Sequence, residues 1–549
     1  MKRRDMVKLF SLGLLTPWNS MGSGESVDSL ADSVAQDTFP CGISSGDPSD
    51  SGVILWTKLS ASCIKPGQSL FFIVADDSGL NQVVLRGKVG SDAIRAENDY
   101  TIRIDLDGQL DANRFYYYRF YYGQDASRLG RCRTLPAEDQ DLSQLSFAIA
   151  NCQDYTNGYY NAYDHIAKDA VDYILHLGDF IYESLLVHKE GHYPDRRIEL
   201  PSGKHIAQDI EDYRHLYQIY KSDGFLQKAL AKHTIIHIWD DHESVNNAYW
   251  DYDSDTMAAP GNHSDKSSDE MRQLKLDSQQ AWYEYLPVRA EYFADEEHPH
   301  DRLEIYRSFS FGKLAHLMLT DGRTYRSRPS CDESKTYLSS KYCDKSEPAF
   351  YGSMLGREQK DWLLSELTGT GSIWKLWGNQ TLFSQASIKI ANRQVTTLNT
   401  DSWDGYSEER DEIMATIKDH NIENFTVLTG DFHATIVSDI IPENSVDKKP
   451  VGLELLTPAL SSTNMYNSLV NKAGSLKFLS GLVTGLVVKL MKRGNRGMRF
   501  LNPFDQGYAL LTVTEDSLSY TAYKVSKEKR KSDSKRDVIT HVVQKRSGL

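Results

Sequence analysis

The sequence is poor in cysteine, has no excess of basic residues and contains no long apolar segment. Six cysteines among 549 residues are too few for a disulfide scaffold, and no Cys-x-x-Cys pair suggests a zinc knuckle. Lys and Arg total 62 against 76 for Asp and Glu, and this net charge of −14 argues against nucleic-acid binding. Every apolar run is shorter than the ~20 residues that a membrane-spanning helix needs, so no stable membrane span is expected.

The chain has the composition of a large folded protein. Hydrophobic residues make up 40% and charged residues 25%, as in ordinary globular domains. At ~150 residues per domain, a chain of 549 residues is expected to contain more than one domain.

The first residues have the pattern of a targeting signal. Met1–Leu15 reads MKRRDMVKLFSLGLL, and Arg3-Arg4 before a short apolar stretch resembles a twin-arginine export signal. We therefore expect residues 1–35 to be a signal, the twin-arginine translocase to be a transient partner, and the mature protein to be periplasmic or secreted. The alternative is a simple basic N-terminus. Because this route carries folded proteins, it also favours a cofactor that is loaded before export.

The rest of the chain divides into regions that differ in their pattern of apolar residues. Residues 36–137 show short alternating runs rich in β-branched and aromatic residues, which predict a small antiparallel sandwich. Residues 144–525 alternate buried apolar runs with helical stretches, which predicts an α/β layer structure. Phe478–Met491 is apolar and is expected to be a buried or lid helix. Residues 526–549 are expected to form a basic tail.

Four apolar runs end in residues that bind metals. They lead into Asn151-Cys152-Gln153, Gly178-Asp179-Phe180-Ile181-Tyr182-Glu183, Asp240-Asp241-His242-Glu243 and Gly430-Asp431-Phe432-His433. Ligands gather outside the carboxyl ends of parallel strands, so these groups are expected to meet. The glycines before Asp179 and Asp431 are expected to let the backbone turn sharply. Thiolate, phenolate and imidazole suit a trivalent or soft ion and carboxylate a hard divalent one, which predicts two unlike metals side by side.

Further motifs accompany these strand ends in a fixed order from about residue 39 to about residue 525. They are Ser45-Gly-Asp-Pro48, Leu55-Trp-Thr57, Trp239-Asp-Asp-His-Glu243 with Asn246-Asn247, Asp321-Gly-Arg323 with Tyr325-Arg326, and Asp401-Ser-Trp-Asp-Gly-Tyr406. Together the motifs resemble the PhoD-type alkaline phosphatase/phosphodiesterase family. The resemblance implies an α/β fold, a calcineurin-like metallophosphatase β-sandwich flanked by helices, preceded by a small all-β fibronectin/Ig-like domain.

The resemblance also implies the metals and their ligands. It places Cys152, Asp179, Tyr182 and His433 around Fe³⁺, and Asp179, Asp241 and Asp431 around Ca²⁺. Asp240 and Asn246 are further candidates. Asp241 and Asp431 replace ligands that are an amide and a histidine in the wider calcineurin-like superfamily, and both changes favour a hard cation. The ligand set by itself also admits Mn²⁺ or Zn²⁺.

The implied activity is hydrolysis of phosphate monoesters by direct attack of a metal-bound hydroxide, with no phospho-enzyme. The resemblance gives His242 and Arg323 phosphate-facing roles, while Asn151 and Asn247 either orient the phosphate or form turns. Two other functions stay open: a phosphodiesterase or phospholipase-D-like enzyme using the same site on lipid or cell-wall polymer diesters, and a non-catalytic exported binding protein with structural metals. A monomer is expected.

Cysteine pairing stays open as well. If Cys152 binds a metal, five cysteines remain, and five cannot all pair within the chain. Cys331 and Cys343 flank one local loop and could close it after export, whereas Cys41, Cys63 and Cys132 leave at least one thiol over.

Overall fold

The structure is a computed structural model that describes residues 35–185, 193–329, 352–390, 393–397, 399–442, 448–472, 480–530 and 534–545. The predicted export signal lies outside the described residues, apart from residue 35, as do Cys331 and Cys343. The other four cysteines are free thiols. Among the described helices, none is both long enough and apolar enough to cross a bilayer.

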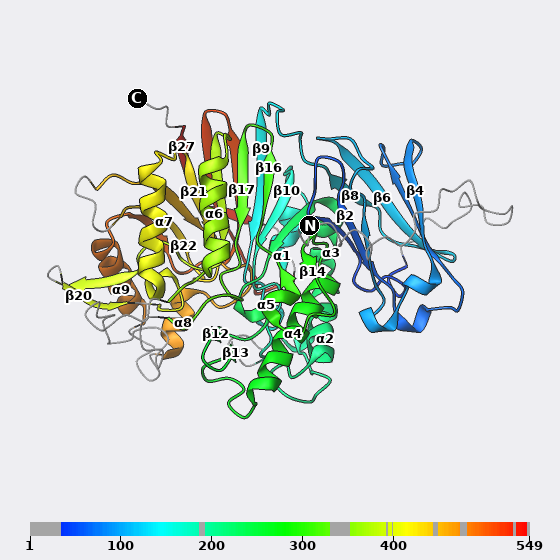
Figure 1. The fold of residues 1–549 in the computed structure, drawn as a ribbon, viewed down its shortest axis with the longest axis horizontal. Coiled ribbons are helices and arrows are strands. Elements are labelled where there is room, and N and C mark those ends of the chain that lie inside the picture. The colour runs from blue at the N-terminus through cyan, green and yellow to red at the C-terminus, as the bar shows by residue number, and fades with distance from the viewer. Residues whose placement is uncertain are drawn as a thin grey trace.

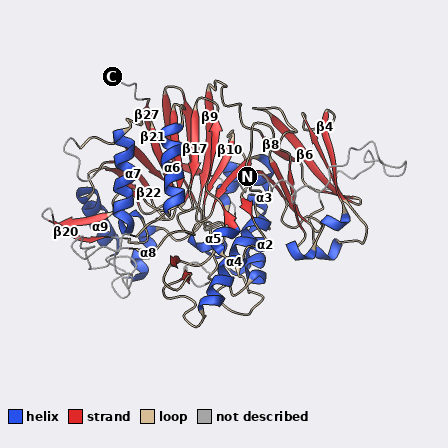
Figure 2. Cartoon of the chain, viewed as in Figure 1, coloured by secondary structure: helices blue, strands red, loops and turns tan. Residues whose placement is uncertain are grey.

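Two large sheets pack face to face in the centre of the molecule (Figures 1 and 2). The nine-stranded sheet has the order β27 (Lys535–Gln544), β26 (Ser517–Val525), β25 (Gly507–Thr514), β9 (Gln144–Ala150), β10 (Tyr173–Leu177), β11 (Thr234–Ile238), β1 (Ile43–Gly46), β2 (Ile54–Lys58), β5 (Thr101–Asp105). The seven-stranded sheet has the order β16 (Arg307–Phe311), β17 (Ala315–Leu319), β18 (Trp374–Asn379), β21 (Phe425–Thr429), β23 (Gly452–Leu456), β22 (Thr435–Ile440), β24 (Met498–Asn502).

The central strands are parallel and fully buried, which explains why they are short apolar runs and not alternating ones. One side of β10 and β11 faces the seven-stranded sheet, and the other side faces helices. The predicted two-layer sandwich flanked by helices is therefore confirmed, and the all-β region before it is present as well.

Helices cover the outer faces of both sheets (Figure 2). Those on the nine-stranded sheet are α1 (Asn161–Ile166), α2 (Ile210–Lys221), α3 (Gly224–Lys232) and α4 (Ser268–Tyr285). Those on the seven-stranded sheet are α6 (Arg357–Gly369) and α7 (Ser407–Asp419). The remaining helices are α5 (Pro299–Arg302), α8 (Met465–Lys472) and α9 (Ser480–Gly494), and the two-stranded hairpins are β12 (Tyr249–Asp251) with β13 (Thr256–Ala258), β14 (Glu291–Tyr292) with β15 (Leu303–Glu304), and β19 (Ser387–Ile390) with β20 (Arg393–Thr397).

The N-terminal sandwich shares a sheet with the rest of the protein. Its outer sheet contains β4 (Val83–Val89), β3 (Leu70–Ala75), β6 (Phe115–Tyr122), β7 (Asp125–Ala126) and β8 (Gly130–Arg133). Its other sheet is β1, β2 and β5, which extend the nine-stranded sheet because β1 pairs in parallel with β11. Gly46 makes this junction possible, since a Cβ there would lie 2.2 Å from the Pro287 carbonyl oxygen. Periodicity in the sequence identifies a strand such as β1, but it cannot reveal that its partner β11 lies some 190 residues away.

The segment expected to be a basic tail contains a strand. β27 runs antiparallel to β26, from the pairing of Ser517 with Gln544 to that of Val525 with Lys535. Its charged side chains are those of a sheet edge, where charge discourages pairing with other chains. Residues 535–544 of the expected basic tail therefore form an edge strand of the nine-stranded sheet.

Helix α9 accounts for most of the apolar segment Phe478–Met491. Val487 and Met491 are buried in a cluster with Met498 and Leu501 of β24, whereas Leu486 is 56% exposed. The segment is thus an amphipathic helix packed against an edge of the seven-stranded sheet. Its first two residues lie outside the described part of the chain.

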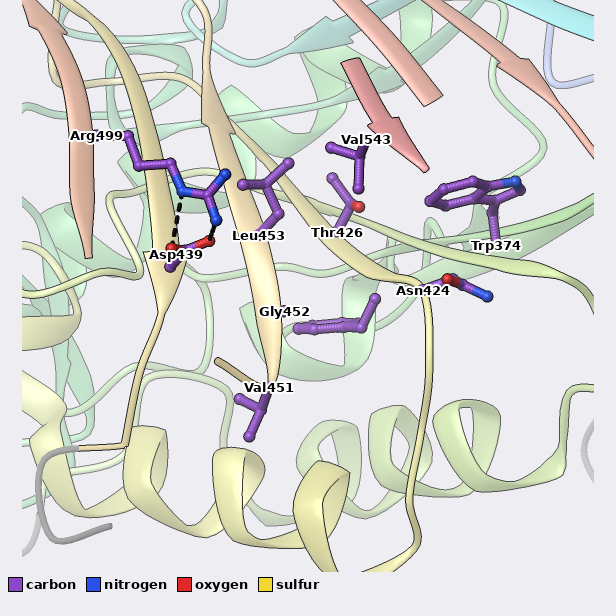
Figure 3. Close-up of a pocket in the computed structure, with 10 residues that line it drawn as sticks. Trp374, Asn424, Thr426, Asp439, Val451, Gly452, Leu453, Arg499 and Val543 are labelled. Carbon is purple, nitrogen blue, oxygen red and sulfur yellow. Dashed lines mark hydrogen bonds and ion pairs between the residues drawn. The ribbon is translucent and has the colours of Figure 1, made fainter. Parts of the chain in front are cut away.

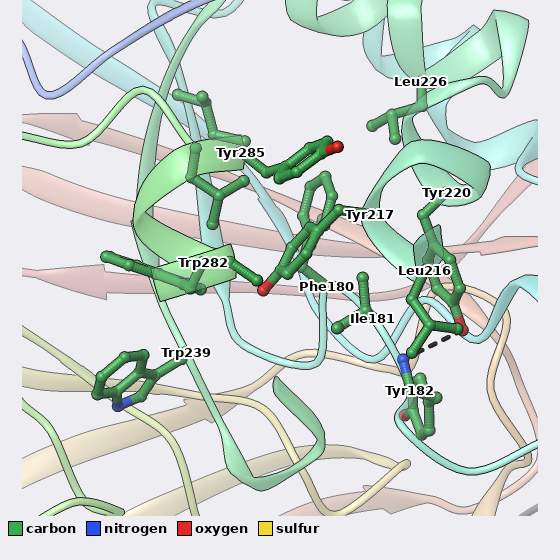
Figure 4. Packing of buried hydrophobic residues seen from close by; sticks show 14 of the residues in the cluster. Phe180, Ile181, Tyr182, Leu216, Tyr217, Tyr220, Leu226, Trp239, Trp282 and Tyr285 are labelled. Carbon is green, nitrogen blue, oxygen red and sulfur yellow. Dashed lines mark hydrogen bonds between the residues drawn. The ribbon is translucent and has the colours of Figure 1, made fainter. Parts of the chain in front are cut away.

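A layer of aromatic rings supports the end of β10 (Figure 4). Tyr217 and Tyr220 of α2 pack against the segment that follows this strand, and the Tyr217 ring stacks on Phe180 with centroids 6.2 Å apart. The Tyr182 N–H donates to the Tyr220 hydroxyl at 3.1 Å. Helix α2 thereby fixes the backbone that carries two predicted ligands, Asp179 and Tyr182.

Two histidines without hydrogen-bond partners lie in the same layer. His176 of β10 and His237 of β11 are register partners with ring centroids 5.5 Å apart. All their ring nitrogens are buried and make no hydrogen bond. Burial lowers the pKa of His176 to about 3 and also lowers the pKa of His237.

We expect these neutral histidines to make the fold sensitive to acid. Below about pH 6.5 the unfolded chain binds protons at both side chains, while the folded chain does not. The free energy of unfolding therefore decreases as the pH is lowered. Each histidine contributes up to about 1.4 kcal/mol per pH unit. In urea titrations between about pH 6.5 and pH 4, His176→Leu should flatten this dependence. His420→Leu, at an exposed position, should not; equal slopes for the two variants would contradict the prediction.

Candidate metal centre

Residues of both sheets meet at one end of the sandwich. Cys152 follows β9, Asp179 and Tyr182 follow β10, Asp240, Asp241 and His242 follow β11, and Asp431 and His433 follow β21. Their ligand atoms form three groups, each with all atoms within 4.8 Å: Cys152, Asp179 and His433; Asp179, Asp241 and His242; Asp240, Asp241 and Asp431. Asp179 and Asp241 each belong to two groups, so neighbouring cations would share ligands.

Tyr182 lies at the Cys152 side of this cluster. Its hydroxyl donates to Asp179 Oδ2 at 3.0 Å and lies 3.5 Å from His433 Nε2. The Tyr182 ring also packs on the His242 ring, with centroids 4.1 Å apart. The four residues expected around iron are thus gathered in one place.

Four of the predicted ligands adopt the left-handed backbone conformation. Cys152, Asp179, Asp431 and His433 have φ of 50°, 56°, 58° and 55°. Such a conformation is uncommon for residues other than glycine and persists only where surrounding contacts enforce it. Gly178 has φ of 97° as expected, but Gly430 does not have positive φ. Gly430 is needed for close approach instead, since a Cβ there would lie 3.1 Å from Asn151 Cβ.

Glu243 joins two of the strand ends. Its carboxylate accepts hydrogen bonds from the backbone N–H groups of Asp179, Phe180 and Asp240 at 2.8–2.9 Å. It therefore fixes the ends of β10 and β11 relative to each other without taking a place among the ligand groups. The motif containing Glu243 was recognised in the sequence, but this role was not.

Arg323 lies among the carboxylates. Its Nε donates to Asp240, its Nη1 donates to Asp401 Oδ2 at 2.7 Å, and its Nη2 lies 3.6 Å from Asp241 Oδ1 and 3.7 Å from Asp431 Oδ1. Nη2 is buried and makes no hydrogen bond, so its donor capacity is unused.

Asp401 orients this arginine. It also forms an ion pair with Arg326 at 2.6 Å, which fixes the carboxylate from the other side. The motif around Asp401 was visible in the sequence, whereas the pairing depends on two loops that the tertiary structure brings together.

His242 has a buried acidic partner. Its Nδ1 lies 2.7 Å from Glu183 Oε2, and the other Glu183 oxygen accepts from the Asn246 N–H at 2.9 Å. Burial disfavours a charged imidazole, but Glu183 and Asp241 outweigh it and raise the pKa of His242. Asn246 contacts this pair through its backbone, and the Asn247 N–H donates to Asp241 Oδ2 at 2.7 Å.

The cluster has more buried negative charge than its own cations offset. Burial and neighbouring carboxylates raise the pKa of Asp179 and of Asp431, and burial together with these carboxylates raises that of the Cys152 thiol. Asp179 Oδ1, Asp240 Oδ2 and Asp431 Oδ2 are buried and accept no hydrogen bond. Buried carboxylates are normally paired or bound to metals, so these residues fit metal ions well.

Asn151 stays close to the centre without belonging to a ligand group. Its side-chain N–H donates to the Thr457 carbonyl at 3.3 Å, while its Oδ1 is buried without a partner. Thr457 begins a loop after β23 that the sequence did not point to, because its contribution is made by backbone groups.

A pocket lies at the end of the seven-stranded sheet opposite the candidate metal centre (Figure 3). Among its lining residues are Phe425 and Gly452, at the starts of β21 and β23, and Arg499, which pairs with Asp439 at 2.7 Å. None of the lining residues drawn there is a predicted site residue. The strand ends that carry the candidate ligands are therefore a separate region.

The fold and the site define the class of protein: two packed sheets flanked by helices, with converging acidic, thiol and imidazole groups at strand ends, form a calcineurin-like metallophosphatase fold. A family model for PhoD-like phosphatase matches residues 147–522, and one for its N-terminal domain matches residues 25–136. The chain belongs to the PhoD-like phosphatase family and is a phosphatase-type hydrolase.

Individual relatives agree with this assignment. Alkaline phosphatase D of Bacillus subtilis (strain 168) is 29% identical over 494 residues, which cover 87% of this chain and 76% of that protein. A solved structure described as "Structure of PhoD" has a TM-score of 0.78 and 26% identity, covering 94% of this chain and 92% of that one. The similarity therefore includes both the N-terminal sandwich and the region of the two central sheets.

Two buried cysteines offer a matched test of the ligand set. We expect Cys152→Ala to lose bound metal and phosphatase activity, because it removes a soft ligand from the cluster. Cys132→Ala, which changes an equally buried thiol in the N-terminal sandwich, should retain both. Metal content by elemental analysis and turnover of a nitrophenyl phosphate provide the measurements. A fully active, metal-replete Cys152→Ala protein would contradict the assignment.

Proposed function

We propose that this protein is an exported alkaline phosphatase that hydrolyses phosphate monoesters at a mixed iron–calcium centre. The observation that carries the proposal is the sharing of Asp179 and Asp241 between adjacent groups of ligand atoms. That arrangement suits two cations a short distance apart, on either side of one phosphoryl group.

The donor set supports unlike metals. Cys152, Tyr182 and His433 would hold Fe³⁺ together with Asp179, while Asp241 and Asp431, with Asp179 between the sites, would hold Ca²⁺. The metal pair would supply positive charge for the phosphate oxygens and acidify a water molecule for attack at phosphorus.

The chain's own residues would position the ester. Arg323 offers Nη2 to a phosphate oxygen, with its other nitrogens fixed by Asp240 and Asp401. His242, held by Glu183, can give a proton to the leaving oxygen. Asn151 Oδ1 is buried without a partner and can accept a hydrogen bond.

A phosphodiesterase acting on lipid or cell-wall polymer diesters remains the second candidate, because the same ligand set serves both ester classes. Export is supported by Arg3-Arg4 in the first residues of the sequence, and we expect a periplasmic or secreted monomer.

Parallel assays test the function. We expect turnover of nitrophenyl phosphate at alkaline pH to exceed turnover of bis(nitrophenyl) phosphate. With a monoester whose phosphorus is made chiral by oxygen isotopes, one turnover should invert the configuration at phosphorus, because attack is direct. A preference for the diester would favour the alternative, and retention of configuration would indicate a covalent intermediate. Loss of all turnover from metal-replete protein would support the non-catalytic alternative.

Glu183→Gln tests the proton donor. The substitution keeps the shape but removes the charge that stabilises the protonated His242. We therefore expect kcat for an alkyl phosphate, whose leaving group needs a proton, to fall by about 10²-fold, and kcat for nitrophenyl phosphate to fall much less. Glu284→Gln, at a buried acid paired with Arg214 away from the centre, is the control. Equal losses for both esters would remove His242 from this role.

A further inference from the structure

One lysine of the C-terminal segment reaches the backbone beside the candidate iron ligands. Lys527 follows β26 and is 6% exposed. Its Nζ donates to the carbonyl oxygens of Ser461 and Ser462 at 2.8 and 3.3 Å. The lysine stem crosses Gly158, where an added Cβ would lie 2.7 Å from it. A buried ammonium needs its hydrogen bonds, so these carbonyls are held where the lysine places them.

Those carbonyls belong to the segment of residues 460–465 that follows β23, which we call the 460–465 loop. The Ser462 N–H donates to the Cys152 carbonyl at 3.1 Å, and the Met465 N–H donates to the His433 carbonyl at 3.0 Å. The Ser462 hydroxyl also hydrogen-bonds the Tyr182 hydroxyl. One short loop therefore contacts Cys152, Tyr182 and His433.

Two of these three residues need such support. Cys152 and His433 have positive φ, which the surroundings must enforce, and the loop bonds directly to the carbonyl of each. Other bonds attach the loop to the same strand end: the Ser461 hydroxyl donates to the Asp154 carbonyl at 2.8 Å, and the Leu460 N–H to the Asn151 carbonyl at 2.9 Å.

We propose that Lys527 is a positioning residue for the candidate iron site, acting through the 460–465 loop on Cys152, Tyr182 and His433. The inference rests on the proposed function for the identity of the metal as iron, but not for the effect of the lysine on the loop. Because Lys527 lies beyond β26, the C-terminal segment is part of the metal centre's support.

The test compares two lysines of this segment in the full-length protein. Lys527→Met removes the loop contact, whereas Lys535→Met removes a part-buried lysine that pairs with Asp169 at 2.7 Å and does not contact the loop. In the protein as isolated, hydrogen exchange at 460–465 should become about tenfold faster for Lys527→Met and should not change for Lys535→Met. Equal exchange in wild type and Lys527→Met would overturn the proposal.

A second readout uses bound iron. In Lys527→Met the phenolate-to-iron absorption band should shift and iron should be lost faster to a chelator, with Lys535→Met like wild type. If wild type itself shows no such band, the iron assignment fails, and the exchange experiment still decides the role of Lys527.

Ser462→Ala provides a test if Lys527→Met does not fold. Loss of the hydroxyl donor makes the Tyr182 phenolate a stronger electron donor, so its absorption band should move to longer wavelength, while exchange of the loop amides should not change. An unchanged band in an iron-loaded Ser462→Ala protein would show that the loop does not act on the ligand, which would also overturn the proposal.

Discussion

The structure depends on keeping several like charges buried side by side. Asp179, Asp240, Asp241 and Asp431 lie within a few ångströms of one another, and among the described residues Arg323 and His242 offset them from within the cluster. Burial of unpaired carboxylates is costly, so bound cations would stabilise the fold. The packed sheets, the aromatic layer at the end of β10 and the positive φ of four candidate ligands together keep these carboxylates in position.

Support for the centre comes from distant parts of the chain. Glu243 joins the ends of β10 and β11, Asp401 fixes Arg323, and Lys527 attaches the C-terminal segment to the 460–465 loop. The N-terminal sandwich is not independent either, because β1 continues the nine-stranded sheet beside β11. The strands that carry the candidate ligands are therefore braced by residues that are not themselves among those ligands.

Much of the fold could be predicted from the sequence. The runs Tyr173–Leu177 and Thr234–Ile238 are apolar throughout, and their endings already carry Asp179 and Asp241. Alternation also revealed the strands of the N-terminal sandwich. The β1–β11 junction and strand β27 were missed, because periodicity shows that a strand exists and which face is apolar but not which strand it joins.

The sequence by itself determined the residue types of the site and their order, because the ligand side chains follow directly on apolar strands. Only the tertiary structure decided that Arg323 points among the carboxylates, that Glu183 holds His242, and that backbone carbonyls of Cys152 and His433 are held by the 460–465 loop. The physical reason is that these contacts use backbone groups or charges brought together from distant loops. Such contacts leave no local pattern of spacing or hydrophobicity.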